Sequence, residues 1–170
     1  LGDDPGEMAS LGTVDLGENR TATAIAAGNE HVCAILDDGR VLCWGDADHI
    51  YYPWMSSDKT AIVDLGAGRT AIAIAAGEEH TCVILDTGGV KCWGDNSHGQ
   101  LGYDNTNGVT STSMSSRPTV DLGVGRTAVA ITAGQDHTCV ILDTGGVKCW
   151  GDGTSGKLGY DSTDNKGDSA

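Results

Sequence analysis

The stretch GEEHTCVILDTGGVKCWGD, residues 77 to 95, organises the chain because it occurs three times in slightly different forms. The other copies are GNEHVCAILDDGRVLCWGD at residues 28 to 46 and GQDHTCVILDTGGVKCWGD at residues 134 to 152. The copies begin 49 and 57 residues apart, and self-similarity at such a period is typical of a repeat architecture. The sequence therefore predicts three structural repeats.

Each copy predicts a β-hairpin that is closed by a disulfide. If residues 86 to 88 form a three-residue loop, Cys82 faces Cys92 on the opposite strand, close enough for a disulfide. The last residue of such a loop takes a left-handed conformation, which costs glycine least. Glycine occupies that place in every copy, as Gly39, Gly88 and Gly145. The pattern thus predicts one disulfide per repeat: Cys33–Cys43, Cys82–Cys92 and Cys139–Cys149.

Composition excludes several classes of function. The chain has 24 acidic and 10 basic residues, a net charge of −14, which opposes binding to nucleic acids and anionic membranes. No stretch has the roughly 18 apolar residues of a membrane-spanning helix, so we expect no membrane insertion. Paired cysteines indicate an oxidising compartment, and the chain is expected to be secreted or located on the cell surface.

The repeat boundaries follow from the motif VDLG, which recurs at residues 14, 63 and 120. The segment before the first motif is similar to the end of a repeat, so we interpret it as the tail of a preceding unit. The predicted organisation is a tail at residues 1–13, repeat 1 at 14–62, repeat 2 at 63–119 and an incomplete repeat 3 at 120–170.

Four strands are expected in each repeat. Residues 71 to 76 alternate alanine with isoleucine, which favours a strand that is buried on both faces. The two hairpin strands follow, and DNSHGQLG at residues 95 to 102 is interpreted as a glycine-rich turn and a short fourth strand. We therefore predict an all-β chain of three four-stranded antiparallel blades of the β-propeller type.

The run VDLGxGRTAxAIxAGxxHTCxILDxGxVKCWGDxxxGxLGYD is nearly complete in repeats 2 and 3. It resembles the repeat of the regulator-of-chromosome-condensation family, in the cysteine-paired version of secreted and surface proteins. The resemblance implies a β-propeller, usually of about seven blades, that serves as a rigid platform for protein–protein contacts. This chain departs from the pattern because it has three repeats and because the first lacks GQLG.

Three blades are too few to close a ring, which needs roughly four to eight. They form either an open segment that stacks end to end or part of a larger propeller. The first hypothesis is a non-enzymatic extracellular structural or adhesive protein that associates with copies of itself or with another surface protein. The alternative is a fragment of a closed propeller that binds or inhibits a specific protein. An enzyme is not expected, because the most distinctive residues recur in every repeat as framework residues do.

The histidines two positions before the first cysteine of each pair allow two interpretations. His80, Cys82 and Cys92 share one hairpin face and could supply three zinc ligands. A disulfide beside a histidine bound to a neighbouring backbone group is favoured, because structural zinc sites have four ligands. The tryptophans of the repeated CWG motif, which are Trp44, Trp93 and Trp150, are expected to pack between blades.

Two further sites are predicted outside the repeated motif. Tyr51, Tyr52 and Trp54 form an aromatic cluster that could contact a protein or a glycan, although packing against a neighbouring blade is an equal alternative. Asn19 lies in the sequon NRT and is a predicted glycosylation site. The loops DNTNG and DSTDNKGD lack a complete calcium-binding pattern, so no metal site and no cofactor are predicted.

Overall fold

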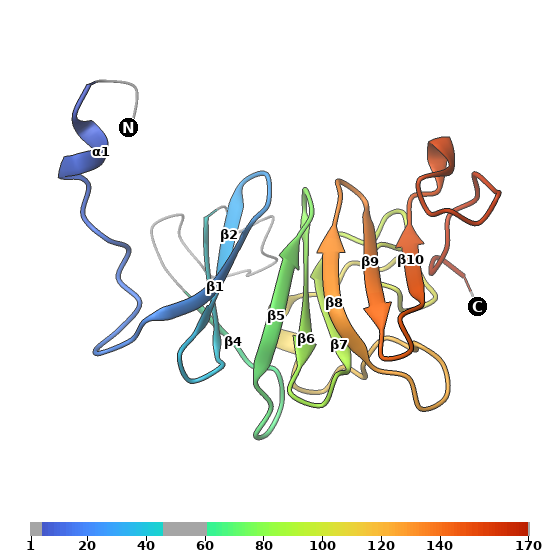
Figure 1. Cartoon of the computed structure of the whole chain (residues 1–170), viewed down its shortest axis with the longest axis horizontal. Coiled ribbons are helices and arrows are strands. Elements are labelled where there is room, and N and C mark those ends of the chain that lie inside the picture. The colour runs from blue at the N-terminus through green and yellow to red at the C-terminus, as the bar shows by residue number, and fades with distance from the viewer. Residues whose placement is uncertain (1–4, 46–60, 170) are drawn as a thin grey trace.

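The computed structural model describes residues 5–45 and 61–169, which form a row of β-sheets (Figure 1). The elements, in chain order, are α1 (Glu7–Ser10), β1 (Ala22–Ala27), β2 (His31–Leu36), β3 (Val41–Gly45), β4 (Ala61–Val63), β5 (Ala71–Ala76), β6 (His80–Leu85), β7 (Val90–Gly94), η1 (Ser111–Ser113), β8 (Ala128–Ala133), β9 (His137–Leu142), β10 (Val147–Gly151) and η2 (Thr154–Gly156). No helix within these ranges has the length and apolar character needed to cross a membrane.

The strands form three antiparallel sheets, which we call blades 1, 2 and 3. Blade 1 has the order β1-β2-β3-β4, blade 2 the order β5-β6-β7, and blade 3 the order β8-β9-β10. Figure 1 shows the blades side by side in chain order, with α1 standing away from blade 1. The prediction of an all-β chain with three blades is therefore confirmed.

The hairpin that is closed by a disulfide has the predicted strand register. Cys82 lies opposite Cys92 in the β6–β7 pair, and the amide of Gly88 donates to the carbonyl of Leu85 at 2.8 Å across the three-residue loop. Gly88 has a φ of 78°, in the left-handed region that the loop requires. The three predicted cysteine pairs are joined, with a Cα–Cα distance of 4.1 Å in each: Cys33–Cys43, Cys82–Cys92 and Cys139–Cys149.

The glycine-rich turn predicted at residues 95–102 is confirmed, but the short fourth strand predicted with it is wrong. This segment forms consecutive turns, in which Gly99 N donates to Asn96 O at 3.0 Å and Gly102 N to Gly99 O at 2.9 Å. Both glycines have positive φ angles, so the backbone cannot extend. The fourth strand of blade 1 is instead β4, in which Val63 pairs with Val41. Within the described residues blades 2 and 3 have three strands each.

The first strand of each blade is less buried than its alternating pattern predicts. The pairing of β5 with β6 shifts between Ala71 and Ala73, which leaves Ile72 as a bulged residue with 61% of its surface exposed. Val129 occupies the same place in β8 and is also 61% exposed. Because a bulged residue does not share the pleat of its neighbours, it cannot pack where strict alternation would put it.

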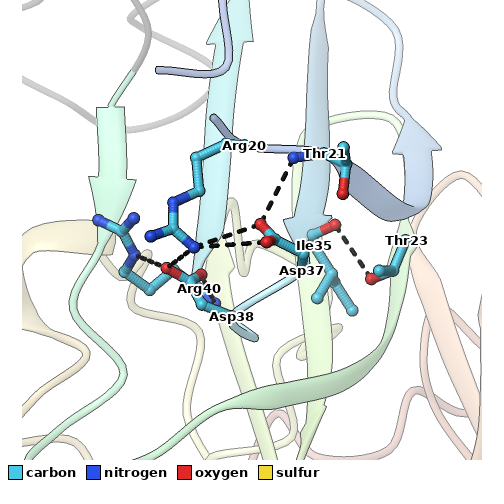
Figure 2. Close-up of polar contacts among 7 residues, drawn as sticks. All are labelled: Arg20, Thr21, Thr23, Ile35, Asp37, Asp38 and Arg40. Carbon is cyan, nitrogen blue, oxygen red and sulfur yellow. Dashed lines mark hydrogen bonds and ion pairs between the residues drawn. The ribbon is translucent and has the colours of Figure 1, made fainter. Parts of the chain in front are cut away.

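An arginine–aspartate contact ties the start of each blade to its hairpin loop. In blade 1 (Figure 2), Arg20 Nη1 lies 3.4 Å from Asp37 Oδ1 and 3.0 Å from Asp38 Oδ2. Arg40 also contacts Asp38, at 2.7 Å. The corresponding pairs in blades 2 and 3 are Arg69–Asp86 and Arg126–Asp143, both at 3.2 Å. The recurrence explains why an arginine precedes the first strand of every repeat.

Candidate functional site

The two seams between consecutive blades are closed through glycines that leave no room for a side chain. A Cβ placed on Gly39 would lie 2.5 Å from Cβ of Thr70, and one on Gly88 would lie 2.6 Å from Cβ of Thr127. Gly145 occupies the same loop position in blade 3, where an added Cβ would meet nothing within 4 Å among the described residues. The hairpin loop of each blade therefore packs against the next blade wherever a next blade is present.

Backbone hydrogen bonds repeat across the two seams. Each seam has one bond from the loop before the second strand and one bond to the hairpin-loop glycine. They are Asn29 N to Glu78 O (3.1 Å), Ala71 N to Gly39 O (2.8 Å), Glu78 N to Gln135 O (3.0 Å) and Ala128 N to Gly88 O (2.8 Å). Blades 1 and 2 thus meet in the same geometry as blades 2 and 3.

A buried histidine crosses each seam to a threonine of the next blade. His31 Nε2 lies 2.8 Å from Thr81 Oγ1, and His80 Nε2 lies 2.9 Å from Thr138 Oγ1. The expectation of a histidine bound to a neighbouring backbone group is therefore wrong, because its partner is a hydroxyl of the adjacent blade. The zinc alternative is also wrong for the described geometry, since the neighbouring cysteines are joined as disulfides and offer no thiolate.

The hydrogen-bond chain fixes the tautomer of His80. Thr138 Oγ1 donates its single proton to the carbonyl oxygen of Gln100 at 2.9 Å, so it can only accept from the histidine. His80 is therefore protonated at Nε2, and its Nδ1 has no partner among the described residues. Burial lowers the pKa of His80 to about 4, with a further lowering from nearby His31, so the ring is neutral at pH 7.

The tryptophans of blades 2 and 3 are buried as expected. Trp93 is 1% exposed and Trp150 is 6% exposed. The indole Nε1 of Trp150 donates to the carbonyl oxygen of Gln100 in blade 2 at 2.9 Å. The carbonyl oxygen of Gln100, in the turn that contains GQLG, therefore accepts hydrogen bonds from both Trp150 and Thr138. This turn thus joins blade 2 to blade 3.

The outer face of blade 3 presents the residues that form a seam elsewhere, but here they are exposed. Ile84 and Val90 of blade 2 are 0% exposed, whereas their counterparts Ile141 and Val147 are 42% and 61% exposed. His137, the counterpart of His31 and His80, has no threonine partner of the next blade among the described residues. We call this surface the free face of blade 3.

At the opposite end of the stack, one side chain that forms a seam bond elsewhere is replaced. Blade 1 begins with Thr21 and Ala22, as blade 2 begins with Thr70 and Ala71, but Val32 stands where blade 2 has Thr81. Valine has no hydroxyl and cannot bond a histidine from a preceding blade. The exposed side of blade 1 therefore has the backbone groups that form hydrogen bonds at a seam, but it lacks the hydroxyl group that a histidine of a preceding blade would bond.

The remaining predicted site residues are only partly placed. Tyr51, Tyr52 and Trp54 lie outside the described residues, so the aromatic contact surface stays a prediction. Asn19 is exposed in the turn before blade 1, which leaves its side chain accessible, and its glycosylation also stays a prediction.

Stacked antiparallel blades joined by repeated seams define a β-propeller-type chain. One model of the regulator of chromosome condensation (RCC1) repeat matches residues 22–49, 71–100 and 128–157. A second model of the same repeat matches residues 87–141. Because these matches cover more than half of the chain, it belongs to the RCC1 repeat family. No curated protein sequence matches it.

Solved structures show the same fold at low sequence identity. Human WBSCR16 has a TM-score of 0.75 at 22% identity over 91% of this chain and 41% of its own. Yeast RCC1 (Prp20), solved with Kap60 bound, has a TM-score of 0.68 at 18% identity over 86% and 36%. The ectodomain of the Physcomitrella patens receptor kinase CR4 has a TM-score of 0.56 at 21% identity over 85% and 34%. The chain therefore spans less than half the length of these proteins.

Proposed function

We propose that this chain is a non-enzymatic extracellular scaffold that binds proteins by extending its row of blades. The observation that carries the proposal is the free face of blade 3, where Ile141 and Val147 repeat two residues that are fully buried in blade 2. Exposed apolar groups in this arrangement favour association. In blade 2, Val90 O accepts a hydrogen bond from Val120 N at 2.9 Å, so the segment that leads into the next blade covers this edge. A following repeat placed here would cover Ile141 and Val147 in the same way.

The occupant we propose is blade 1 of a second copy, which gives end-to-end association into a larger assembly or fibril. Two backbone bonds of the seam would form, one from the amide of Gln135 to the carbonyl of Asn29 and one from the amide of Ala22 to the carbonyl of Gly145. A contact between different surfaces that does not close on itself propagates as a filament. His137 would face Val32 of the second copy and would lack the hydrogen bond to a threonine that His31 and His80 make.

A specific observation favours a second candidate, in which the chain is a segment of a closed propeller that binds or inhibits one protein. Val32 is the residue least suited to receive blade 3, so a different repeat carrying threonine would fit the free face better. The solved relatives are also more than twice as long as the aligned region. In this candidate the neighbouring blades belong to the same closed ring.

The disulfides and the surface support the proposed location and partners. Three intramolecular disulfides are suited to an oxidising environment outside the cytosol, and secretion or display on a cell surface follows. Asn19 would carry a glycan there, and the net charge of −14 disfavours nucleic acid as a partner. Copies of the chain, another surface protein and glycans are the proposed ligands.

The mass of the chain in solution tests the proposal. Multi-angle light scattering should show species larger than a monomer that increase with concentration. Val32→Thr should strengthen this association because it supplies the missing hydroxyl, and Val147→Lys should abolish it. A wild-type chain that stays monomeric, with Val32→Thr unable to shift it, would refute self-association and leave the closed-propeller candidate.

A further inference from the structure

Three side chains of types that can ligate a metal ion lie together across the seam between blades 2 and 3. Asp95 follows β7, His98 lies in the turn after it, and Asp136 immediately precedes β9. One ligand atom from each lies within 4.8 Å of the others. The Asp95 amide donates to the carbonyl of Glu79 at 2.8 Å, which holds the start of this turn against its own blade.

Hydrogen bonds orient His98 as a ligand. Ser97 Oγ donates its proton to Asp95 Oδ2 at 2.6 Å and lies 3.0 Å from His98 Nδ1. Because the hydroxyl proton is used on Asp95, the contact with His98 requires a proton on Nδ1. The lone pair of the neutral ring is therefore on Nε2, which is the arrangement found when the second nitrogen of a metal-bound histidine is hydrogen-bonded.

Asp95 is held in a similar way. Its Oδ2 accepts from Ser97 and, at 2.8 Å, from Gln100 Nε2. Burial raises the pKa of Asp95, but the hydrogen bonds from Ser97, Asn96 and Gln100 outweigh it and lower the pKa overall. The hydrogen bonds from Ser97 and Gln100 hold the Asp95 carboxylate close to His98.

The corresponding aspartate in blade 3 is paired with a lysine side chain. Asp152 is the counterpart of Asp95, and the ammonium group of Lys157 contacts it directly. The counterpart of Lys157 in blade 2 is the uncharged Gln100. Within the described ranges no lysine or arginine forms an ion pair with Asp95 or Asp136. The negative charge at the blade 2–3 seam is therefore not neutralised by the protein in the way that blade 3 neutralises its own.

The electrostatic environment of Asp136 is consistent with this difference. Burial raises the pKa of Asp136, and His98 lowers it to a smaller extent. The carboxylates of Glu78, Asp152 and Asp95 then raise it further.

We propose that Asp95, His98 and Asp136 bind a divalent transition-metal ion of the zinc class and thereby fasten blade 2 to blade 3. An imidazole nitrogen with two carboxylate oxygens suits such an ion, and the imidazole distinguishes the site from a calcium site. Zinc bonds to these ligands measure about 2.0–2.2 Å. Donor atoms around one ion thus lie roughly 3–4 Å apart, so small side-chain movements suffice. Water or a partner's side chain would complete the coordination.

Zinc titration of the chelator-treated, oxidised chain tests the site by calorimetry and by thermal unfolding. We expect one zinc ion per chain and a rise in Tm on addition of zinc. His98→Asn and Asp136→Asn should each weaken zinc binding by about tenfold or more. The control is Glu18→Gln, which removes one negative charge from an exposed turn of blade 1 and should leave zinc affinity unchanged.

Two comparisons make the proposal refutable. Each variant should have the same Tm as the wild type in the presence of chelator, which separates loss of the ligand from loss of the fold. Zinc affinity that is retained in His98→Asn would overturn the proposal, as would the absence of zinc binding. Equal binding of calcium and zinc, weakened to the same extent by Glu18→Gln, would show only a diffuse attraction of cations to an acidic surface.

Discussion

Replacing glycine by alanine in the hairpin loops of different blades tests the stacking of the blades within one molecule. Gly88 and Gly145 have φ angles of 78° and 82°, so alanine carries the same left-handed backbone penalty of about 1–2 kcal/mol at both. Only at Gly88 does the new methyl group also meet a neighbour, at 2.6 Å from Cβ of Thr127. Overpacking of this kind costs about 1–3 kcal/mol more.

The expected difference between the two variants is therefore about 2 kcal/mol in the free energy of unfolding, or roughly 4–8 °C in Tm for a chain of this size. Urea and thermal unfolding, followed by circular dichroism at low protein concentration, measure it. Gly39→Ala should behave like Gly88→Ala, because its methyl group would lie 2.5 Å from Cβ of Thr70. Equal destabilisation by Gly88→Ala and Gly145→Ala would refute the packing of blade 2 against blade 3.

Three other predictions concern the groups that hold the blades. Replacing Cys82 and Cys92 together by alanine opens a loop with a sequence separation of 10 and should cost about 2.7 kcal/mol from loop entropy; urea unfolding measures this, and modification of all cysteines by iodoacetamide before reduction would contradict the pairing. Thr138→Val leaves His80 Nε2 without its acceptor and should cost about 1–3 kcal/mol, and a neutral effect in urea would contradict the hydrogen bond. The pKa of His80 is lowered to about 4 in the folded chain, so the unfolded state binds a proton first as the pH falls below about 6.5, and the free energy of unfolding should decrease between about pH 6.5 and 4. His80→Gln should flatten that part of the stability–pH curve, and an unchanged slope would contradict the assignment.

The features that the sequence predicts well are those encoded inside one hairpin. The loop glycine, the facing cysteines and the strand lengths depend on positions that are about ten residues apart or fewer, and a single turn geometry fixes them. Three copies of the same pattern make the prediction stronger, because the Gly39, Gly88 and Gly145 loops all satisfy it. The predicted strand at residues 95–102 fails because Gly99 and Gly102 turn the chain, and a glycine-rich run gives no alternation from which to detect this.

The seams could not be predicted in the same way, because their partners lie in different repeats. His80 and His137 are both followed by the sequence TCVIL, and nothing local shows that the ring of His80 bonds Thr138. The Asp95, His98 and Asp136 group is equally hidden, since one member belongs to the next repeat. A usable signal existed in the aligned copies, where Gln100 replaces the Lys157 that neutralises Asp152.

The same comparison of copies explains why identical sequence does not mean an identical role. Ile84 and Ile141 stand at the same place in the segment HTCVIL, yet one is fully buried and the other is 42% exposed. Nothing in either hairpin differs enough to cause this, so the exposure is decided by whether a neighbouring blade is present. Apolar burial contributes roughly 25 cal/mol for each Å² removed from water, and the end blade lacks that contribution on its outer side. Blade 3 should therefore be less stable than blade 2 as long as its free face is uncovered.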